Sequence, residues 1–342
     1  MDPPGWDKLP PRVQLLVLTH GKRISQTVYA AAELQVADHL VDGPRTPAEL
    51  ATAIGCDATA LYRLLRCTAA VGVFRERADG AFELTPMAEA LRSDIPGSQR
   101  DLVLLNGDEM SWRPYGDIVH SIRTGEPAFE RVFGRSYFEH LAAHPVSAEL
   151  FDRAMTQMSR FTTASLLEEL DLTGYDTIVD VGGGRGYFLA EVLRRRPESR
   201  GVLADRAPVV AEAGPLLEKA GVADRVTVRP TDFFAEVPPG GDAYLLKAVL
   251  HDWDDPQATR ILSRIREAIG DRPGACLFVL EHVVAPANAW DAGKFIDIDM
   301  LLRFGGRERN RAEWQRLLGA AGFELANDPA AGRWAVLQCR PR

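Results

Sequence analysis

Residues 178–186 read Ile-Val-Asp-Val-Gly-Gly-Gly-Arg-Gly, a β-branched run that leads directly into a glycine-rich loop. Glycine suits a loop whose backbone turns tightly and approaches a ligand, because it has no Cβ to stand in the way. A dinucleotide-binding fingerprint would place its third glycine at residue 187, but that residue is Tyr187, and the glycines fit a Gly-x-Gly-x-Gly pattern instead. The stretch therefore predicts a strand, a ligand-binding loop and then a helix.

The chain on either side of this stretch, from Tyr175 onward, alternates short apolar segments with helices of roughly 10–15 residues. Residues 209–221 and 308–323 are expected to be helices, and residues 242–250 a strand or the start of one. Repeated strand–helix alternation is typical of the α/β class. We expect a Rossmann-like, doubly wound sheet in this half of the chain.

The N-terminal hundred residues have a different pattern. An apolar helix is expected from Val13 to about Leu40, and residues 46–49, Thr-Pro-Ala-Glu, carry the signals of a helix start. A further helix over residues 58–73 leads into two strand-like segments around residues 79–80, Asp-Gly, the best hairpin signal in the chain. Helix, turn, helix and hairpin together predict a winged helix.

We therefore divide the chain into a winged-helix-like domain over residues 1–100 and a second domain over residues 101–342, which starts with a helical connector up to about residue 165. The first hundred residues hold 11 Lys and Arg against 12 Asp and Glu, a net charge of −1, and the whole chain carries −8. Duplex binding relies on neutralising several phosphates, so this charge argues against DNA. The apolar first helices suit a dimer surface, although they could equally be core.

Composition sets further limits. A length of 342 residues suggests about two domains, and 46% hydrophobic with 26% charged residues is an ordinary globular balance. The four cysteines are scattered, the first ten residues do not resemble a signal peptide, and no apolar run reaches the length of a membrane span. We expect a cytoplasmic protein that binds neither membrane nor nucleic acid.

Carboxylates lie at the ends of successive predicted strands. Asp180 precedes the glycine-rich loop, Asp205 ends the next strand 19 residues after Gly186, and Asp232 with Phe233 follows the third strand. These side chains suit, in turn, an ammonium group, ribose hydroxyls and an adenine ring. Together the three groups describe S-adenosylmethionine. Asp180 could instead accept hydrogen bonds from nearby backbone amides.

One histidine is placed for proton transfer. His251 follows an apolar strand and precedes a carboxylate, and histidine has an unperturbed pKa near neutrality, so it is a candidate general base. Glu281 and Glu308 could orient it, but each could equally be a surface carboxylate. His140 and His144 have the i,i+4 spacing of a metal pair, but no third ligand is evident, and we expect no metal site.

Methionine and aromatic side chains are expected to bind an apolar, aromatic acceptor, although such residues at helical spacing are more often core. The candidate acceptor-binding residues are Met155, Met158, Phe161, Asp252 and Met300.

With these features in place, the chain resembles the S-adenosylmethionine-dependent O-methyltransferases of the caffeic acid and hydroxyindole type, which include bacterial enzymes of aromatic natural-product biosynthesis. The motifs that carry the resemblance span almost the whole chain. They are VDVGGGRG (179–186), DFF (232–234), LLKAVLHDW (245–253), LEH (280–282), DMLLRFGGRER (299–309) and FDRAMTQMS (151–159).

The resemblance implies a role for each matching residue. The cofactor contacts that it implies are Asp180, Gly182 and Gly184 at the methionine part, Asp205 at the ribose, Asp232 and Phe233 at the adenine, and Lys247 nearby. It implies His251 as the base, with Glu281 and Glu308 orienting it, and an intertwined homodimer built by the N-terminal region. One departure is Arg206 after Asp205, where the family usually has leucine, and this puts the following turn in doubt.

We therefore expect methyl transfer to a hydroxyl, phenolic by preference, of an aromatic small molecule, within secondary-metabolite biosynthesis. Transfer to carbon or nitrogen, and a noncatalytic cofactor-binding relative, are the alternatives. A winged-helix DNA-binding regulator is the least favoured alternative.

Overall fold

Residues 8–342 are described by the structure, a computed structural model, in which the chain divides into two units. The first unit holds the chain up to Trp112 together with Glu149–Gln157, and the second holds Arg113–Ala148 and Met158–Arg342. The long helix α11 (Pro145–Glu169) contributes to both units. Each unit is described separately.

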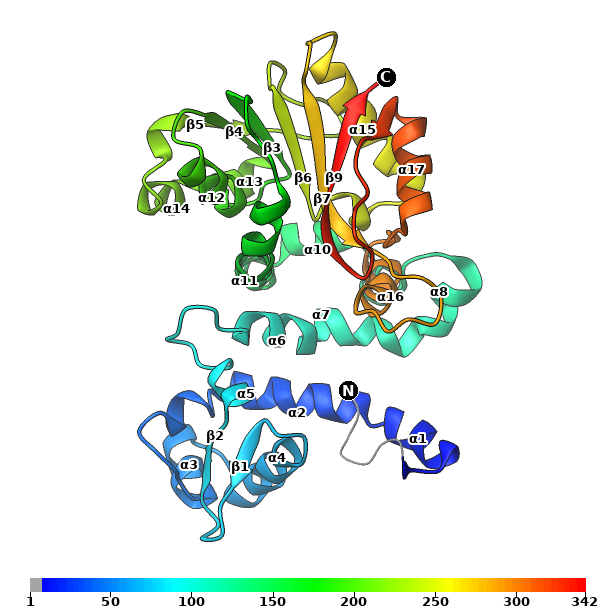
Figure 1. The fold of residues 1–342 in the computed structure, drawn as a ribbon. Helices are drawn as coiled ribbons and strands as arrows, with labels where there is room; N and C mark the ends of the chain where they lie inside the picture. The colour runs from blue at the N-terminus through cyan, green and yellow to red at the C-terminus, as the bar shows by residue number, and fades with distance from the viewer. Residues whose placement is uncertain (1–7) are drawn as a thin grey trace. The chain divides into compact units, whose positions relative to one another are not determined.

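The first unit is helical with one small hairpin (Figure 1). Its elements are α1 (Pro11–Leu18), α2 (Gly21–Glu33), η2 (Asp38–Leu40), α3 (Pro47–Ile54), α4 (Ala58–Ala70), β1 (Phe74–Glu76), β2 (Phe82–Leu84), α5 (Pro86–Glu89), α6 (Arg100–Gly107) and α7 (Glu109–Trp112). Thr46 caps α3 in a capping box with Glu49, and Phe74 pairs with Leu84 across the hairpin. The predicted helix–turn–helix–hairpin order is confirmed.

The expected single helix from Val13 to about Leu40 is wrong. The chain leaves α1 at Thr19 and leaves α2 at Leu34, and Gln35 then takes a left-handed conformation with φ of 53°. A non-glycine residue with positive φ cannot continue an α-helix. The remaining residues up to Leu40 form turns and the short helix η2.

The second unit is built on a seven-stranded sheet with strand order β5-β4-β3-β6-β7-β9-β8. The strands are β3 (Thr177–Val181), β4 (Arg200–Asp205), β5 (Val226–Pro230), β6 (Ala243–Lys247), β7 (Cys276–Val283), β8 (Phe323–Leu325) and β9 (Arg333–Pro341). Strands β3 to β7 pair in parallel, while β9 is antiparallel to both β7 and β8. The predicted doubly wound sheet is confirmed, and its strand order reverses between β3 and β6, where open α/β sheets bind ligands.

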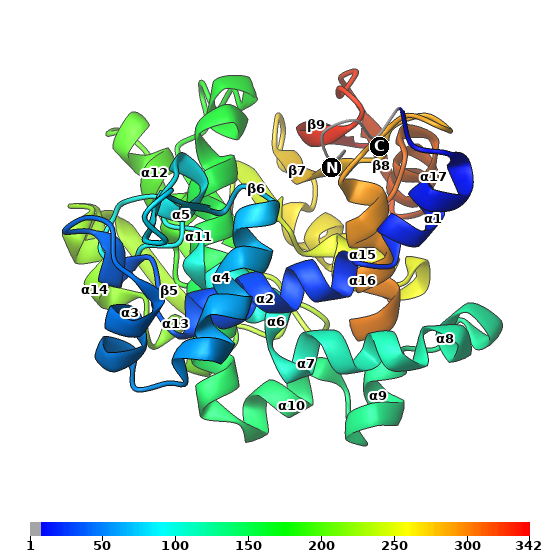
Figure 2. The ribbon, with the colours of Figure 1, turned by 90° about the horizontal axis from the view of Figure 1, so that it is seen from below.

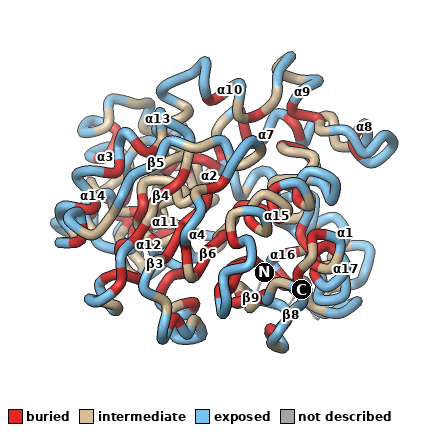
Figure 3. The backbone as a smooth tube through the Cα atoms, turned by 90° about the horizontal axis from the view of Figure 1, so that it is seen from above, coloured by how far each residue is buried: buried red, intermediate tan, exposed pale blue. Residues whose placement is uncertain are grey.

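Helices cover both faces of this sheet (Figures 1 and 2). The helices and turns of the unit are η3 (Arg113–Asp117), α8 (Ile118–Thr124), α9 (Ala128–Phe133), α10 (Tyr137–Ala143), α12 (Tyr187–Arg195), α13 (Ala207–Val210), α14 (Gly214–Lys219), η4 (Ala223–Arg225), η5 (Leu250–Asp252), α15 (Asp255–Ile269), α16 (Gly293–Arg303) and α17 (Arg311–Ala320). One core packs α15 and α17 against one face of the sheet, and the other packs α12 to α14 and the end of α11 against the opposite face. Buried residues follow the strands between them (Figure 3).

Two local expectations need correction, and a third that the sequence leaves open, a strand or the start of one over residues 242–250, is decided in favour of the start. The helix expected over residues 209–221 is two helices, α13 and α14, because Gly214 and Pro215 start a new helix. The helix expected over residues 308–323 is shorter, and Phe323 starts β8 instead. The strand expected over residues 242–250 ends at Lys247, because Ala248 takes a positive φ of 54°. The residues that follow it form the turn η5.

Two further features concern the whole described chain. Among residues 8–342, no helix combines the length and the apolar character that crossing a bilayer requires. The four cysteines are all free thiols.

Candidate active site

The glycine-rich loop after β3 lies against the chain that follows β6. Gly182, Gly184 and Gly186 have φ values of 71°, 59° and 82°, which side chains rarely adopt. A Cβ on Gly182 would also lie 2.7 Å from Val249 Cγ2 and 3.7 Å from the Phe233 ring. Gly182 therefore meets the connection after β6 with no room for a side chain, and it also contacts Phe233 after β5.

Asp180 lies in β3 between β4 and β6, with only 1% of its surface exposed. Neither of its carboxylate oxygens has a hydrogen-bond partner among the described residues. Burial raises the pKa of Asp180 to about 7, against the opposing charge of Lys247. A buried carboxylate without a donor fits a ligand that brings its own ammonium group, so this residue suits the amino-acid end of S-adenosylmethionine.

Lys247, at the end of β6, is the cation that Asp180 faces. Its ammonium donates to Ser159 Oγ at 3.0 Å, and burial lowers the pKa of Lys247 to about 8. The carboxylate of Glu281 opposes this shift, as does that of Asp180. The ammonium of Lys247 therefore interacts with the carboxylate of Asp180, beside the glycine-rich loop, and with that of Glu281, which belongs to the cluster described below.

The other predicted cofactor residues lie at neighbouring strand ends. Asp205 accepts hydrogen bonds from Gly184 N at 2.8 Å and Arg206 N at 2.6 Å, and burial raises its pKa. The structure thus ties the end of β4 to the glycine-rich loop. Asp232 is exposed after β5 and accepts from Phe234 N at 2.9 Å.

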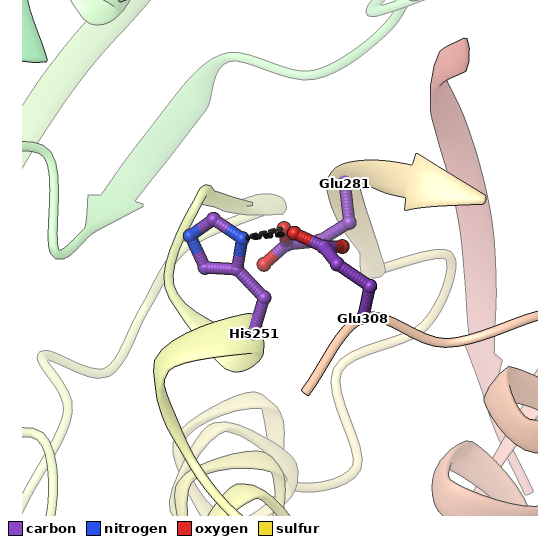
Figure 4. Close-up of side chains that lie close together, drawn as sticks. All are labelled: His251, Glu281 and Glu308. Atoms are coloured by element: carbon purple, nitrogen blue, oxygen red, sulfur yellow. Dashed lines mark hydrogen bonds and ion pairs between the residues drawn. The ribbon is translucent and has the colours of Figure 1, made fainter. Parts of the chain in front are cut away.

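His251 lies in η5, beyond the end of β6, and two glutamates lie on one side of its ring (Figure 4). His251 Nδ1 is 2.8 Å from Glu308 Oε1 and 3.7 Å from Glu281 Oε2. On the other side of the ring, Nε2 is 3.6 Å from Asp252 Oδ1. His251, Glu281 and Glu308 are far apart in sequence, and the fold brings them together in the arrangement that the resemblance implied.

Hydrogen bonds tie both glutamates into the fold. Glu281, at 0% exposure in β7, accepts from Val249 N at 3.0 Å and Leu250 N at 2.8 Å through Oε1. Glu308 N donates to Asp297 Oδ1 of α16 at 2.8 Å. The first contacts fix the carboxylate of Glu281 to the turn that carries the histidine, and the second ties the backbone of Glu308 to α16.

The electrostatics of the cluster favour a positive charge on the imidazole. Burial acts to lower the pKa of His251, but the carboxylates of Glu281, Glu308 and Asp252 outweigh it and raise that pKa to about 10. Burial raises the pKa of Asp252 to about 7, and it also raises the pKa of Glu281. The cluster can therefore store and release protons across the neutral and alkaline range.

A buried arginine that was not predicted from the sequence holds the histidine turn. Arg309 has 0% exposure, and its guanidinium donates to Leu250 O at 3.0 Å, Trp253 O at 2.9 Å and Asp255 Oδ1 at 2.8 Å. Arg309 follows Glu308 directly in the chain. By binding the turn η5, Arg309 therefore also places Glu308 opposite that turn. In the sequence Arg309 lies in the charged run Arg-Glu-Arg, which carries no signal of burial.

The expected acceptor residues are only partly brought to this site. Met300 on α16 is buried at 7% exposure and Asp252 lies beside His251, whereas Phe161 is 72% exposed. Along α11, Met155 belongs to the first unit, and Met158 to the second.

The two histidines weighed as a metal pair, His140 and His144, lie outside the group of described residues that has metal-ligand geometry. The His140 and His144 rings stack at 3.9 Å. Within residues 8–342, the group with metal-ligand geometry is His251, Glu281 and Glu308, whose ligand atoms lie within 4.8 Å of one another. The histidine–glutamate hydrogen bond already occupies the facing atoms of that group.

Known proteins share this architecture. The model of the O-methyltransferase domain family matches residues 112–324, and that of the O-methyltransferase dimerisation domain matches residues 16–94. The 8-amino-8-demethylriboflavin N,N-dimethyltransferase of Streptomyces davaonensis is 41% identical over 93% of this chain and 92% of its own. A phenazine O-methyltransferase of Lysobacter antibioticus is 38% identical over 96% and 95% of the two chains.

A solved structure adds the cofactor. The O-methyltransferase from neocarzinostatin biosynthesis, in complex with S-adenosyl-L-homocysteine and 1,4-dihydroxy-2-naphthoic acid, superposes with a TM-score of 0.80 and 34% identity, covering 93% of this chain and 96% of its own. The unpartnered Asp180 and the tight glycine-rich loop fit the same kind of cofactor. The chain therefore belongs to the family of S-adenosylmethionine-dependent O-methyltransferases that act on small molecules, and S-adenosylmethionine is its cofactor.

Proposed function

We propose that this enzyme transfers a methyl group to a hydroxyl of an aromatic acceptor, with His251 as the general base. The observation that carries the proposal is the hydrogen bond of 2.8 Å between His251 Nδ1 and Glu308 Oε1. It occupies one ring nitrogen and leaves Nε2 as the nitrogen that can take the acceptor's proton. Glu281 and Glu308 act by positioning the ring and stabilising its protonated form.

We also propose which residues bind the cofactor, and the unpartnered carboxylate of Asp180 beside the glycine-rich loop supports this assignment. Asp180, with Gly182 and Gly184, holds the methionine part of S-adenosylmethionine, and Asp205 binds the ribose. Asp232 and Phe233 bind the adenine, and Lys247 lies beside the methionine part. When bound, the cofactor supplies an electrophilic methyl group on a positively charged sulfur.

The chain's own residues set the proton chemistry. A phenol has a pKa of about 10, close to the pKa of about 10 at His251, so proton transfer between them is nearly balanced. The site must lose one proton to the solvent before or as the acceptor binds, because the imidazole is charged at neutral pH. Activity is therefore expected to rise as pH increases from 7 toward 10.

Transfer to an amine is the second candidate, because the relative that is 41% identical is an N,N-dimethyltransferase. A neutral amine attacks through its own lone pair and loses its proton afterwards. An amine acceptor would therefore depend far less on His251 than a phenol would.

The test is His251→Ala, with His144→Ala as the control because His144 is exposed. Formation of S-adenosylhomocysteine is measured with a panel of phenols and arylamines, and cofactor binding by calorimetry. We expect turnover of phenols to fall by about 10²–10⁴-fold in His251→Ala with cofactor affinity retained. Turnover of a phenol within a few-fold of wild type would exclude His251 as the base. No turnover of any acceptor by the wild type would favour a noncatalytic relative.

We also propose that the enzyme works as a homodimer in the cytoplasm. The dimerisation-domain match over residues 16–94 supports the first point, and the four free cysteines agree with a reducing compartment. The acceptors we propose are intermediates of aromatic secondary metabolism.

A further inference from the structure

Helix α16 presents one face to the catalytic cluster. Asp297 on this helix accepts the hydrogen bond from Glu308 N, and Met300 and Arg303 follow at intervals of three residues. Residues three apart on a helix lie on nearly the same face. Met300 and Arg303 are both buried, at 7% and 8% exposure. Asp297 and Arg303 are six residues apart, so Arg303 lies on a neighbouring face, at the C-terminal end of α16.

The buried guanidinium of Arg303 has an N–H donor for which the described residues supply no acceptor. Its hydrogen bond within residues 8–342 runs from Nη2 to Asp299 Oδ1 at 3.2 Å, and the buried Nε has no partner there. A guanidinium has five N–H donors, and a buried donor without an acceptor is unfavourable. Asp299 is itself shared, because the same Oδ1 accepts from Tyr115 Oη at 2.6 Å. Arg303 therefore has donor capacity that the protein does not fill.

The charge of Arg303 acts on the carboxyl next to the histidine. It acts to lower the pKa of Asp252, the carboxyl that lies 3.6 Å from His251 Nε2. Nε2 is the nitrogen that faces the acceptor hydroxyl in the proposed reaction. Gly306, three residues after Arg303, lies against the backbone of His251 and Asp252, so the end of α16 that carries Arg303 lies beside the turn that carries the histidine.

We propose that Arg303 binds a carboxylate on the acceptor, so that the enzyme prefers aromatic hydroxy acids over uncharged phenols. A carboxylate supplies the acceptor atoms that Nε lacks and a charge that a guanidinium binds through strong, directional hydrogen bonds. A purely apolar ring would leave Nε unpaired. The inference rests on the proposed function only in treating this side of the cluster as the acceptor site.

The test compares ligands that differ only at the carboxylate. Binding of 1-hydroxy-2-naphthoate, its neutral amide and 1-naphthol to the enzyme loaded with S-adenosylhomocysteine is measured by calorimetry. Wild type, Arg303→Leu, Arg303→Lys and the control Arg311→Leu are compared, since Arg311 is exposed. Because binding needs no turnover, the result is independent of whether His251 is the base. Turnover of the same ligands then tests the proposed function separately.

We expect wild type and Arg311→Leu to bind the carboxylate about 10-fold or more tightly than 1-naphthol, with the amide between them. Arg303→Leu should lose most of this preference. Arg303→Lys should keep only part of it, because lysine cannot place a donor at the position of Nε. Equal affinities in wild type, or an unchanged preference in Arg303→Leu, would overturn the proposal. If Arg303→Leu fails to fold, an undiminished preference in Arg303→Lys would overturn it instead.

Discussion

Asp180 is a charge that the fold buries without a hydrogen-bond partner. Its pKa of about 7 is raised mainly by burial, so the folded protein binds this proton more tightly than the unfolded chain does. The contribution of Asp180 to the free energy of unfolding is therefore lost as pH rises from about 4 to about 7. Asp180 therefore weakens the fold of the cofactor-free protein at neutral pH. We expect the ligand that binds beside the glycine-rich loop to supply the missing partner of its carboxylate.

We predict that Asp180→Asn stabilises the cofactor-free protein at pH 8, by roughly 1–4 kcal/mol, because it removes the buried charge. At pH 4 the variant and wild type should be nearly equal, since the wild-type carboxyl is then protonated. Urea unfolding at the two pH values measures this. Calorimetry should show that the same variant binds S-adenosylmethionine poorly. A variant less stable than wild type at pH 8 would contradict this account of Asp180.

A second residue-level prediction concerns the charge on His251. Glu308→Gln removes one of the carboxylates that raise the pKa of His251 to about 10, so this pKa should fall by about 1–3 units. In the wild type, the charged imidazole contributes its full stabilisation below the ordinary pKa of 6.5, and this contribution is lost as pH rises toward 10. In the variant, the same contribution should be lost at a lower pH. Nitrogen NMR of the ring reports the pKa directly. Glu267→Gln, at an exposed pair with Arg264, should leave it unchanged.

At the scale of elements, the loop between α16 and α17 is locked onto the turn η5. Arg307 N donates to His251 O at 2.8 Å, and Arg309 clamps Leu250 and Trp253 on either side of the histidine. A Cβ on Gly306 would lie 2.1 Å from His251 O, so only glycine allows this approach. The hydrogen bond between His251 and Glu308 thus depends on how closely two backbone segments meet.

We predict that Gly306→Ala separates these segments and destabilises the protein by about 1–3 kcal/mol, as overpacking does. Turnover should fall more than stability suggests, because Glu308 moves away from His251. Thermal unfolding and the activity of the folded fraction measure the two effects. The matched control is Gly116→Ala, where a Cβ meets nothing within 4 Å. Equal behaviour of the two variants would contradict the lock.

Elements with strong local signals were predictable from the sequence and the others were not. The alternation of apolar strands and helices was enough to place Asp180, Asp205 and His251 at neighbouring strand ends. Helix α16 carries no such signal, because its N-cap is Ala292 with no capping side chain, and β8 is only three residues long. The roles of Asp297 and Arg309 depend on partners distant in sequence, which spacing alone cannot reveal.

At the scale of the whole molecule, helix α1 is the element whose apolar side chains stand out as exposed among residues 8–342. Helix α1 contains no buried residue, and Leu15, Leu16 and Leu18 are 65%, 63% and 63% exposed. The dimerisation-domain match begins at residue 16, within this helix. An apolar surface on a dimerisation domain with near-zero net charge points to a second copy of the chain and not to DNA.

We predict that the double variant Leu15→Lys, Leu18→Lys shifts the protein from dimer to monomer, because it places two charges on a surface that the second copy would bury. Analytical ultracentrifugation over a range of concentrations measures the shift as an increase in the dissociation constant of at least about 100-fold. Val146→Lys is the control, since Val146 is exposed at 83% but lies outside the dimerisation domain. The folded chain should keep its cofactor affinity, because the residues proposed to bind the cofactor lie in the second unit. A double variant that remains a dimer would exclude α1 from the interface. The exposed leucines of α1 would then not be explained by dimerisation.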